Sequence, residues 1–140
     1  MVRITILDLQ KKILINPGRI KRIVNNVLKL EKAKSKGELT ISFTTDALIQ
    51  KLNKKYLKKN APTDVLAFDI TTPKEKKELI ADIVVSTDTA LRNAKVFNTT
   101  PFYELNLYSI HGLLHLLGYD DHSSKNRKLM RKKELKYVHP

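Results

Sequence analysis

Three of the four histidines in this 140-residue chain lie in one short stretch, "HGLLHLLGYDDH" at 111–122. His111 and His115 are four residues apart, a spacing that stacks two side chains on one face of a helix. Two imidazoles in this arrangement can bind one transition-metal ion. Gly118 can end the helix and allow a sharp reversal, so that the chain returns a third ligand to the ion. We expect one divalent ion here, with zinc (Zn2+) as the preferred element.

His122 is the natural candidate for the third ligand, because it follows the predicted helix end within a few residues. Three protein ligands and an open fourth position are typical of a catalytic zinc. His111 and His115 would then be catalytic through the water that the ion holds. Two alternatives remain open. The histidines could be core residues bonded to backbone carbonyls, or the metal could be structural, with Asp120 or Asp121 as a further ligand.

Alternating and capped segments predict the elements that must position this group. The stretches "VRITIL" and "ELTISFT" alternate like strands, and "VLAFDI" and "LIADIVVS" are apolar runs that a polar linker joins into a hairpin. Helices are expected over 17–30, from 46 to about 57, over 87–97, over 101–117 and from about 123. The expected caps are Asn16, Thr45 or Asp46, Ser86 or Thr87, and Thr100.

This order of elements favours an α+β fold, a mixed α/β layer in a single domain over residues 1–140. We expect a small mixed sheet with one hairpin, packed by helices, in which one central buried helix carries the histidines. In the helix after Thr45, the side chains of Leu48, Ile49, Leu52 and Tyr56 should face inward. In the last helix, the apolar positions are Leu129, Met130, Leu135 and Val138.

Charge is the strongest signal of the composition. The chain has 27 basic and 14 acidic side chains, which give a formal net charge of +13, and lysine is far commoner than arginine. Such a surface attracts polyanions, and lysine suits phosphate contacts better than bidentate reading of bases. The plain alternative is a surface that only keeps the protein in solution.

Other classes of protein are disfavoured. No run of apolar residues is long enough to span a membrane, and the first residues lack the pattern of a signal peptide. The absence of cysteine excludes a disulfide partner and a thiolate metal site. We expect a cytoplasmic protein that has no membrane partner.

Several motifs together resemble the YbeY family of bacterial rRNA maturation factors and endoribonucleases. "HGLLHLLGYD" resembles the family signature H-G-x-x-H-L-x-G-Y-D-H. "LNKKYLKKNAPTDVLAF" resembles the block LN-x-x-Y/F…PTDVLSF, and "ADIVVS" resembles the strand GDI-x-I-S. Met130 and Glu134 resemble an M-x-x-x-E pair in the terminal helix. The resemblance implies a metal-dependent, single-strand-directed endoribonuclease in rRNA maturation and ribosome quality control. Its implied partners are an rRNA precursor and the small ribosomal subunit.

The chain departs from the family pattern at three places. Asp121 stands where the ungapped signature has its last histidine, so Asp121 is the alternative third ligand, although we favour His122. Leu57 occupies the position of a family arginine. Lys58 or Lys59 could replace the positive charge of that arginine, but not the planar, two-pronged hydrogen bonding of its guanidinium group. Ala81 replaces the glycine of the GDI strand.

Two acidic residues and two lysines are further candidates for RNA binding or for contacts behind the metal ligands. The "PTDV" block places Asp64 at a strand start, where it either caps a turn or orients a ligand histidine or the substrate. Asp82 lies within an apolar strand, so it must be paired or at an edge, and could contact an imidazole N–H. Lys58 and Lys59 follow the second helix.

Two other functions compete with RNA cleavage as explanations of these motifs. A metallopeptidase of the H-E-x-x-H type needs a glutamate beside the first histidine as general base, and Gly112 occupies that position. A non-catalytic RNA-binding factor in ribosome assembly, with a structural metal, would use lysine-rich segments such as "KNRKLMRKKELK". Cleavage of RNA by a metal-held water combines the ligand spacing with the basic surface.

Overall fold

The computed structural model describes residues 1–138. Its strands are β1 (Val2–Asp8), β2 (Gly37–Thr44), β3 (Val65–Asp69) and β4 (Leu79–Ser86). Its helices are α1 (Pro17–Leu30), α2 (Asp46–Leu57), α3 (Thr87–Phe97), α4 (Pro101–Leu116) and α5 (Ser124–Val138), with a short 3-10 helix, η1 (Pro73–Glu75). The expected α+β fold is confirmed. In the part of the chain that the structure describes, no helix has the length and apolar character needed to cross a membrane.

The four strands form one mixed sheet in the order β1-β2-β4-β3. β1, β2 and β4 run parallel, and β3 is an edge strand that pairs antiparallel with β4. The predicted hairpin between β3 and β4 is therefore confirmed. The hairpin matters for the site because it brings the "PTDV" block to the edge of the sheet that lies beside α4.

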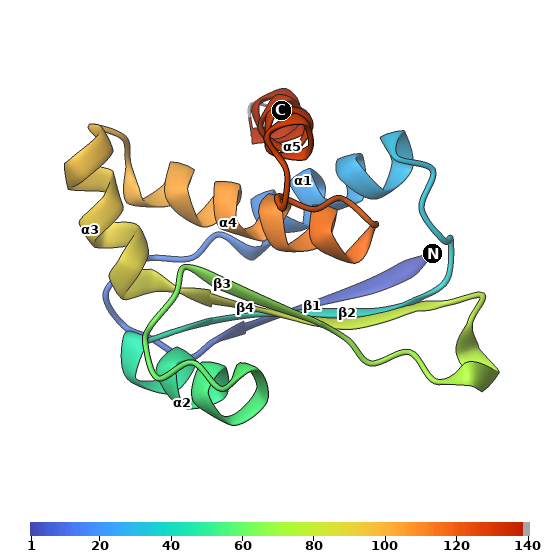
Figure 1. Cartoon of the computed structure of the whole chain (residues 1–140), viewed down its shortest axis with the longest axis horizontal. Coiled ribbons are helices and arrows are strands. Elements are labelled where there is room, and N and C mark those ends of the chain that lie inside the picture. The colour runs from blue at the N-terminus through green and yellow to red at the C-terminus, as the bar shows by residue number, and fades with distance from the viewer. Residues whose placement is uncertain (139–140) are drawn as a thin grey trace.

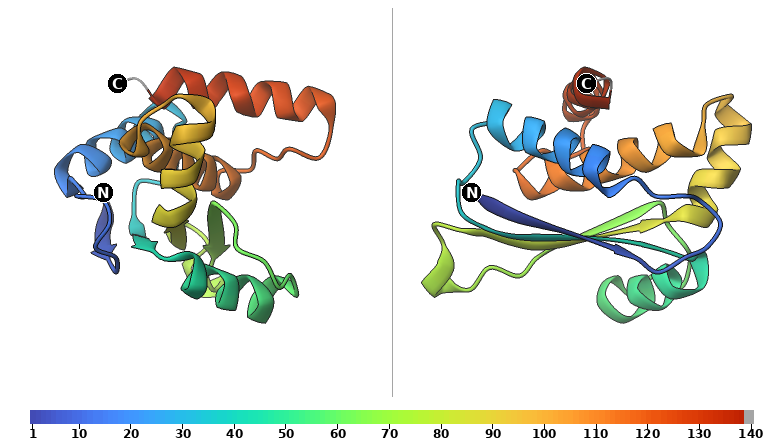
Figure 2. Two further views of the ribbon diagram at one scale, coloured as in Figure 1. Left: turned by 90° about the vertical axis from the view of Figure 1, so that its left-hand side faces the viewer. Right: turned by 180° about the vertical axis from the view of Figure 1, so that it is seen from behind.

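Helices cover the two faces of the sheet unequally (Figure 1). α1, α3 and α4 lie on one face, α5 packs outside α4 and α1, and α2 lies beneath one end of the other face (Figures 1 and 2). α4 is the central buried helix expected from the sequence, since Leu105, Ile110, Leu113 and Leu114 are fully buried. It packs closely on the sheet: a Cβ atom at Gly112 would lie within 3.1 Å of side chains of both β3 and β4.

Five helices begin at residues whose side-chain oxygen accepts the backbone N–H three positions further on. These caps are Asn16, Thr45, Ser86, Thr100 and Ser123. Each satisfies a helical N–H that would otherwise lack a partner, a contribution of about 1 kcal/mol. The sequence predicts Asn16 and Thr100 uniquely, and the structure selects Thr45 and Ser86 from the two pairs of candidates.

Some apolar positions that were expected to face inward are exposed. In α2, Ile49 is buried, but Leu48 is 39% and Tyr56 55% exposed. The reason is that α2 covers only one end of a sheet face, so it has a narrow contact. In α5, two of the four apolar positions named from the sequence, Leu129 and Leu135, are also exposed, because this outer helix buries only the side that carries Met130 and Val138.

Candidate metal centre

His111 and His115 lie side by side on the last turns of α4, as their spacing predicts. Their Nε2 atoms are 2.9 Å apart, and their ring centroids are 4.5 Å apart. The two side chains are 24% and 33% exposed, so the rings reach solvent at the end of a helix whose other side is buried. The structure therefore presents two imidazole nitrogens toward one point.

Gly118 ends this helix and turns the chain. Its backbone has a φ of +102°, a conformation that glycine adopts without strain. The Gly118 N–H donates to the His115 carbonyl at 3.1 Å, and the Tyr119 N–H donates to the Leu114 carbonyl at 3.0 Å. These two bonds define a Schellman motif, which caps the helix and sends the following residues back past the histidines.

Asp121 is the residue that this turn brings to the histidines. Its Oδ2 atom lies 4.0 Å from His111 Nε2 and 3.9 Å from His115 Nε2. The ligand atoms of these three residues all lie within 4.8 Å of one another, and the group could hold a metal ion. The alternative third position suggested by the ungapped signature is thus the one that the geometry favours.

His122 is not part of this group, although the sequence favoured it as the third ligand. The His122 backbone N–H donates to Asp120 Oδ1 at 3.1 Å, and its side chain is exposed. Asp120 also accepts Asn126 Nδ2 at 2.8 Å. These bonds fix a tight turn before α5, and the turn brings the carboxylate of Asp121 inward without the one-residue bulge that His122 would require.

The three ligand atoms suit a small tetrahedral ion. Two ligands bound at about 2.0–2.1 Å on a tetrahedral zinc lie about 3.3 Å from each other. The observed separations of 2.9 to 4.0 Å bracket this value, so small side-chain rotations bring all three atoms to one ion. Two imidazole nitrogens and one carboxylate oxygen are a known ligand set for catalytic zinc, and they leave one coordination position for water.

Glu134 of α5 supports His111 from behind. Its Oε2 atom lies 2.8 Å from His111 Nδ1, and its side chain is only 9% exposed. A carboxylate at this place holds the Nδ1 proton and leaves the Nε2 lone pair free for a metal. In the sequence, Glu134 is noticeable only because it and Met130 resemble the M-x-x-x-E pair of the family. The sequence signal that could have revealed its role is its spacing: Glu134 lies four residues after the apolar Met130, so it is on the face of the helix that packs inward.

The two histidines differ in basicity. Burial alone lowers the pKa of His111, but the hydrogen bond and charge of Glu134, helped by the charges of Asp64 and Asp121, raise it above its ordinary value. For His115, burial and the nearby His111 together hold the pKa below the ordinary value. His115 is therefore the more readily neutral ring, which is the form that binds a metal.

Asp64 stands at the start of β3 and has a turn-forming role. Its Oδ1 accepts the Val65 N–H at 2.8 Å and the Thr63 hydroxyl at 3.2 Å. Its charge also contributes to the raised pKa of His111. The structure thus supports the turn interpretation and adds an electrostatic influence on the site, while no hydrogen bond joins Asp64 to a histidine among residues 1–138.

Asp82, Lys58 and Lys59 do not reach the histidines. Ala81 and Ile83 of β4 are buried under α4, so Asp82 between them faces the opposite side of the sheet. It therefore cannot contact an imidazole N–H, so the expected contact with a ligand histidine is wrong. Lys58 and Lys59 are exposed just after α2, on the same opposite side (Figure 1).

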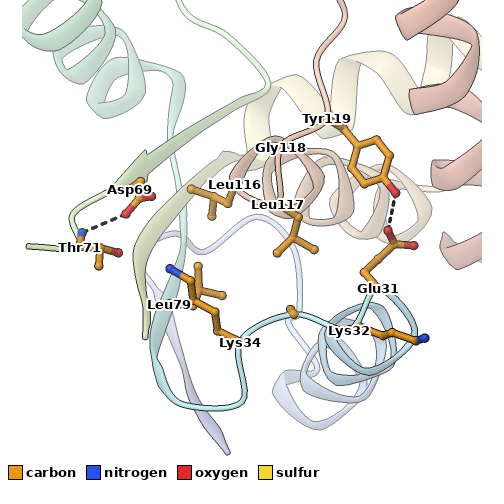
Figure 3. A pocket seen from close by; sticks show the side chains of 11 residues that line it. Glu31, Lys32, Lys34, Asp69, Thr71, Leu79, Leu116, Leu117, Gly118 and Tyr119 are labelled. Carbon is orange, nitrogen blue, oxygen red and sulfur yellow. Dashed lines mark hydrogen bonds between the residues drawn. The ribbon is translucent and has the colours of Figure 1, made fainter. Parts of the chain in front are cut away.

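A buried carboxylate that sequence reasoning missed anchors the loop beside the site. Glu31, at the end of α1, accepts hydrogen bonds from the hydroxyls of Tyr119 and Tyr137 and from Lys133 Nζ at 3.0 Å. Figure 3 shows the Tyr119 contact at the wall of a hollow of about 520 Å³. The anchor ties α1 and α5 to the chain two residues before Asp121. Its partners are far apart in the sequence, so no local pattern could reveal it.

Taken together, the fold and the site define a mixed α/β protein whose central helix carries a histidine–histidine–aspartate group fit for a metal. The family model described as "Endoribonuclease YbeY" matches residues 5–140. The chain is 37% identical to the "Endoribonuclease YbeY" of Syntrophus aciditrophicus, over 94% of this chain and 84% of that one. It is 34% identical to the protein of the same name from Carboxydothermus hydrogenoformans, over 95% and 93%.

A solved structure agrees with these matches. The solution structure of TM1509 from Thermotoga maritima superposes with a TM-score of 0.67 at 30% identity, over 99% of this chain and 87% of that one. The chain belongs to the YbeY endoribonuclease family. The resemblance stated from the sequence motifs is confirmed.

Proposed function

We propose that this protein is a metal-dependent endoribonuclease that cuts single-stranded RNA. The observation that carries the proposal is the convergence of His111, His115 and Asp121 at the solvent-exposed end of α4, in a member of the YbeY family. The finer part of the proposal is that its substrate is an rRNA precursor of the small ribosomal subunit, and that it acts in the cytoplasm.

The three ligand residues would hold one divalent ion, and zinc fits the set of two nitrogens and one oxygen. When bound, such an ion lowers the pKa of a water and offsets negative charge on a phosphoryl oxygen. Glu134 orients His111 by accepting a hydrogen bond from its Nδ1–H, and His115, the more readily neutral ring, can offer its Nε2 lone pair. His111 and His115 are thus catalytic through the ion that they position.

The same helix argues against peptide hydrolysis of the H-E-x-x-H type. Gly112 stands where that mechanism needs a glutamate, and it is buried against the sheet. A side chain at this position would point into Val65 and Ile83 and away from the ligand group. A peptidase base therefore has no place beside His111.

The net charge of +13 supports a polyanionic substrate. Lysines are exposed on α2, on the β3–β4 loop and on α5, and they can bind phosphates with little regard to base. RNA would be drawn to this surface over a long range at low salt.

A time course on structured RNA tests the proposal. The native protein loaded with zinc should cut unpaired segments, and His115→Ala or added chelator should abolish the cutting. Zinc restored after chelation should restore activity in the native protein but not in His115→Ala. Equal cleavage in all samples would point to a contaminating nuclease. RNA binding that persists with no cleavage in any sample would favour the non-catalytic assembly factor.

A further inference from the structure

The sheet face opposite the metal centre carries a carboxylate that has no hydrogen-bond or ion-pair partner among the described residues. Asp82 of β4 lies in register between Thr40 of β2 and Phe68 of β3. Its side chain is half-buried, and no hydrogen bond or ion pair reaches it from residues 1–138. A partly desolvated carboxylate gains from any ligand that supplies N–H donors.

Aromatic and apolar side chains surround this carboxylate. A hollow of about 510 Å³ is lined by Asp82 together with Tyr56, Phe68 and Ile70. The rings of Tyr56 and Phe68 meet edge to face with their centroids 5.4 Å apart. Tyr56 is 55% and Ile70 51% exposed, since α2 covers only one end of this face (Figure 1). The hollow thus combines an exposed aromatic surface with a hydrogen-bond acceptor.

Lysines flank the hollow from two sides. Beyond one end lie the exposed lysines of α2 and of the residues after it: Lys51, Lys54, Lys55, Lys58 and Lys59. The Nζ atom of Lys55 lies 5.2 Å from the centre of the Tyr56 ring. Beyond the other end, the β3–β4 loop carries Lys74, Lys76 and Lys77 (Figure 1). Aromatic rings between cationic segments are the features with which proteins bind single-stranded nucleic acid.

We propose that Tyr56, Phe68 and Asp82 form a base platform that binds one unpaired base of the RNA substrate, with a preference for guanine. The base would stack on the exposed ring of Tyr56 while its edge meets Asp82. An ionised carboxylate only accepts hydrogen bonds. Guanine offers it two neighbouring N–H donors, whereas uracil sets carbonyl oxygens on both sides of its single N–H. The platform rests on RNA being the substrate.

The base platform is separate from the metal centre and would be a second place of contact with the RNA. Asp82 and the histidines are on opposite faces of the sheet, and β3, the neighbour of β4, forms the edge of the sheet. A strand of RNA that passes around β3 could reach both places, because Val65 at the start of β3 packs near Gly112, the neighbour of His111. The platform would then influence which phosphodiester bond is presented for cleavage.

Fluorescence anisotropy with labelled short uridine oligonucleotides, with and without one central guanosine, tests the platform. Native protein should bind the guanosine-containing RNA more tightly. Tyr56→Ala should weaken binding of both RNAs about tenfold, the usual effect of losing one stacked base, and Tyr56→Phe should keep native affinity. Asp82→Asn should reduce the preference for guanosine about tenfold while leaving binding of the uridine RNA nearly unchanged.

Glu38→Gln is the matched control, because Glu38 is an exposed carboxylate on the same sheet face, paired with Arg3 and outside the hollow. It should leave both affinities unchanged. Thermal unfolding of each variant verifies the fold, and gel analysis verifies that the RNA is intact. Native binding with no effect of Tyr56→Ala and Asp82→Asn would overturn the platform alone. Failure of the native protein to bind either RNA would overturn the proposed RNA substrate as well.

Discussion

His111 Nδ1 and Glu134 Oε2 lie 2.8 Å apart, although 23 residues separate them in the chain. This contact links the outer helix α5 to a metal ligand on the central helix α4. Because the carboxylate is almost fully buried, it holds the imidazole in one orientation and one tautomer. The contact gives the terminal helix a role in metal binding, apart from its packing in the core.

Removal of this carboxylate should weaken zinc binding more than it weakens the fold. We expect Glu134→Ala to lower zinc affinity about 10–100-fold, the usual effect of losing a partner of a ligating histidine. Glu134→Gln should have a smaller effect, because its amide oxygen can still accept a hydrogen bond from the His111 Nδ1–H. Competition with a zinc-binding dye measures this. Leu135→Ala, on the exposed side of α5, is the control. Unchanged affinity in a folded Glu134→Ala protein would contradict the role.

The identity of the third ligand can be tested with two neighbouring variants. Asp121→Ala should lose most of the bound zinc, because it removes the only carboxylate within 4.0 Å of both histidines among the described residues. His122→Ala should keep its zinc, since the His122 side chain is exposed outside the group. Elemental analysis of the purified proteins decides between them. Loss of zinc in His122→Ala but not in Asp121→Ala would restore the original preference for His122.

The local parts of the structure follow from the sequence. Asn16 and Thr100 act as caps because a cap depends only on the residue and its next three neighbours. The histidine pair follows from the helical repeat, and Gly118 from the need for positive φ at the helix end. Each of these features is encoded within about one or two turns of chain, so pattern alone predicts it.

The features that escaped prediction depend on contacts between distant segments. The ungapped signature offered Asp121, but the choice between Asp121 and His122 depends on the bond from Asn126 in the next helix to Asp120, which fixes the turn between them. The side of the sheet that Asp82 faces depends on where α4 packs, and β4 has apolar residues on both of its sides. Glu134 reaches His111 only after α5 folds over α4. Short-range periodicity contains no information on any of these contacts.

Gly112 should be required for the close packing of α4 on the sheet. A Cβ atom there would lie 3.0 Å from Val65 Cγ2 and 3.1 Å from Ile83 Cγ2. Alanine gains about 1 kcal/mol over glycine in helix propensity, but overpacking of a core costs about 1–3 kcal/mol. We expect Gly112→Ala to lower the free energy of unfolding by about 1 kcal/mol, as measured by urea denaturation.

Gly18 in the first turn of α1 provides the matched control for this substitution. The nearest atom to a Cβ at Gly18 is 3.7 Å away, which is an ordinary contact. Gly18→Ala should therefore leave the free energy of unfolding unchanged or raise it by up to about 1 kcal/mol. A stabilised Gly112→Ala protein would show that the helix can move away from the sheet.

The Glu31 anchor should make stability depend on pH in the acid range. Burial raises the pKa of Glu31, but the hydrogen bonds from Tyr119, Tyr137 and Lys133 outweigh it and lower the pKa from 4.5 to about 2. Because the folded-state pKa lies below the unfolded one, the ionised carboxylate stabilises the fold fully above about pH 4.5. This contribution, on the order of 3 kcal/mol, is lost as the pH falls from about 4.5 toward 2.

Glu31→Gln isolates this contribution from that of other acids, because glutamine keeps the shape of the side chain and does not titrate. At pH 6 the variant should be less stable than the native protein by an amount on the order of 3 kcal/mol, and the difference should shrink steadily toward pH 2. Urea denaturation of both proteins across this range measures it. A difference in the free energy of unfolding that stays constant with pH would show that the anchor stabilises by shape and hydrogen bonding alone, without the charge of Glu31.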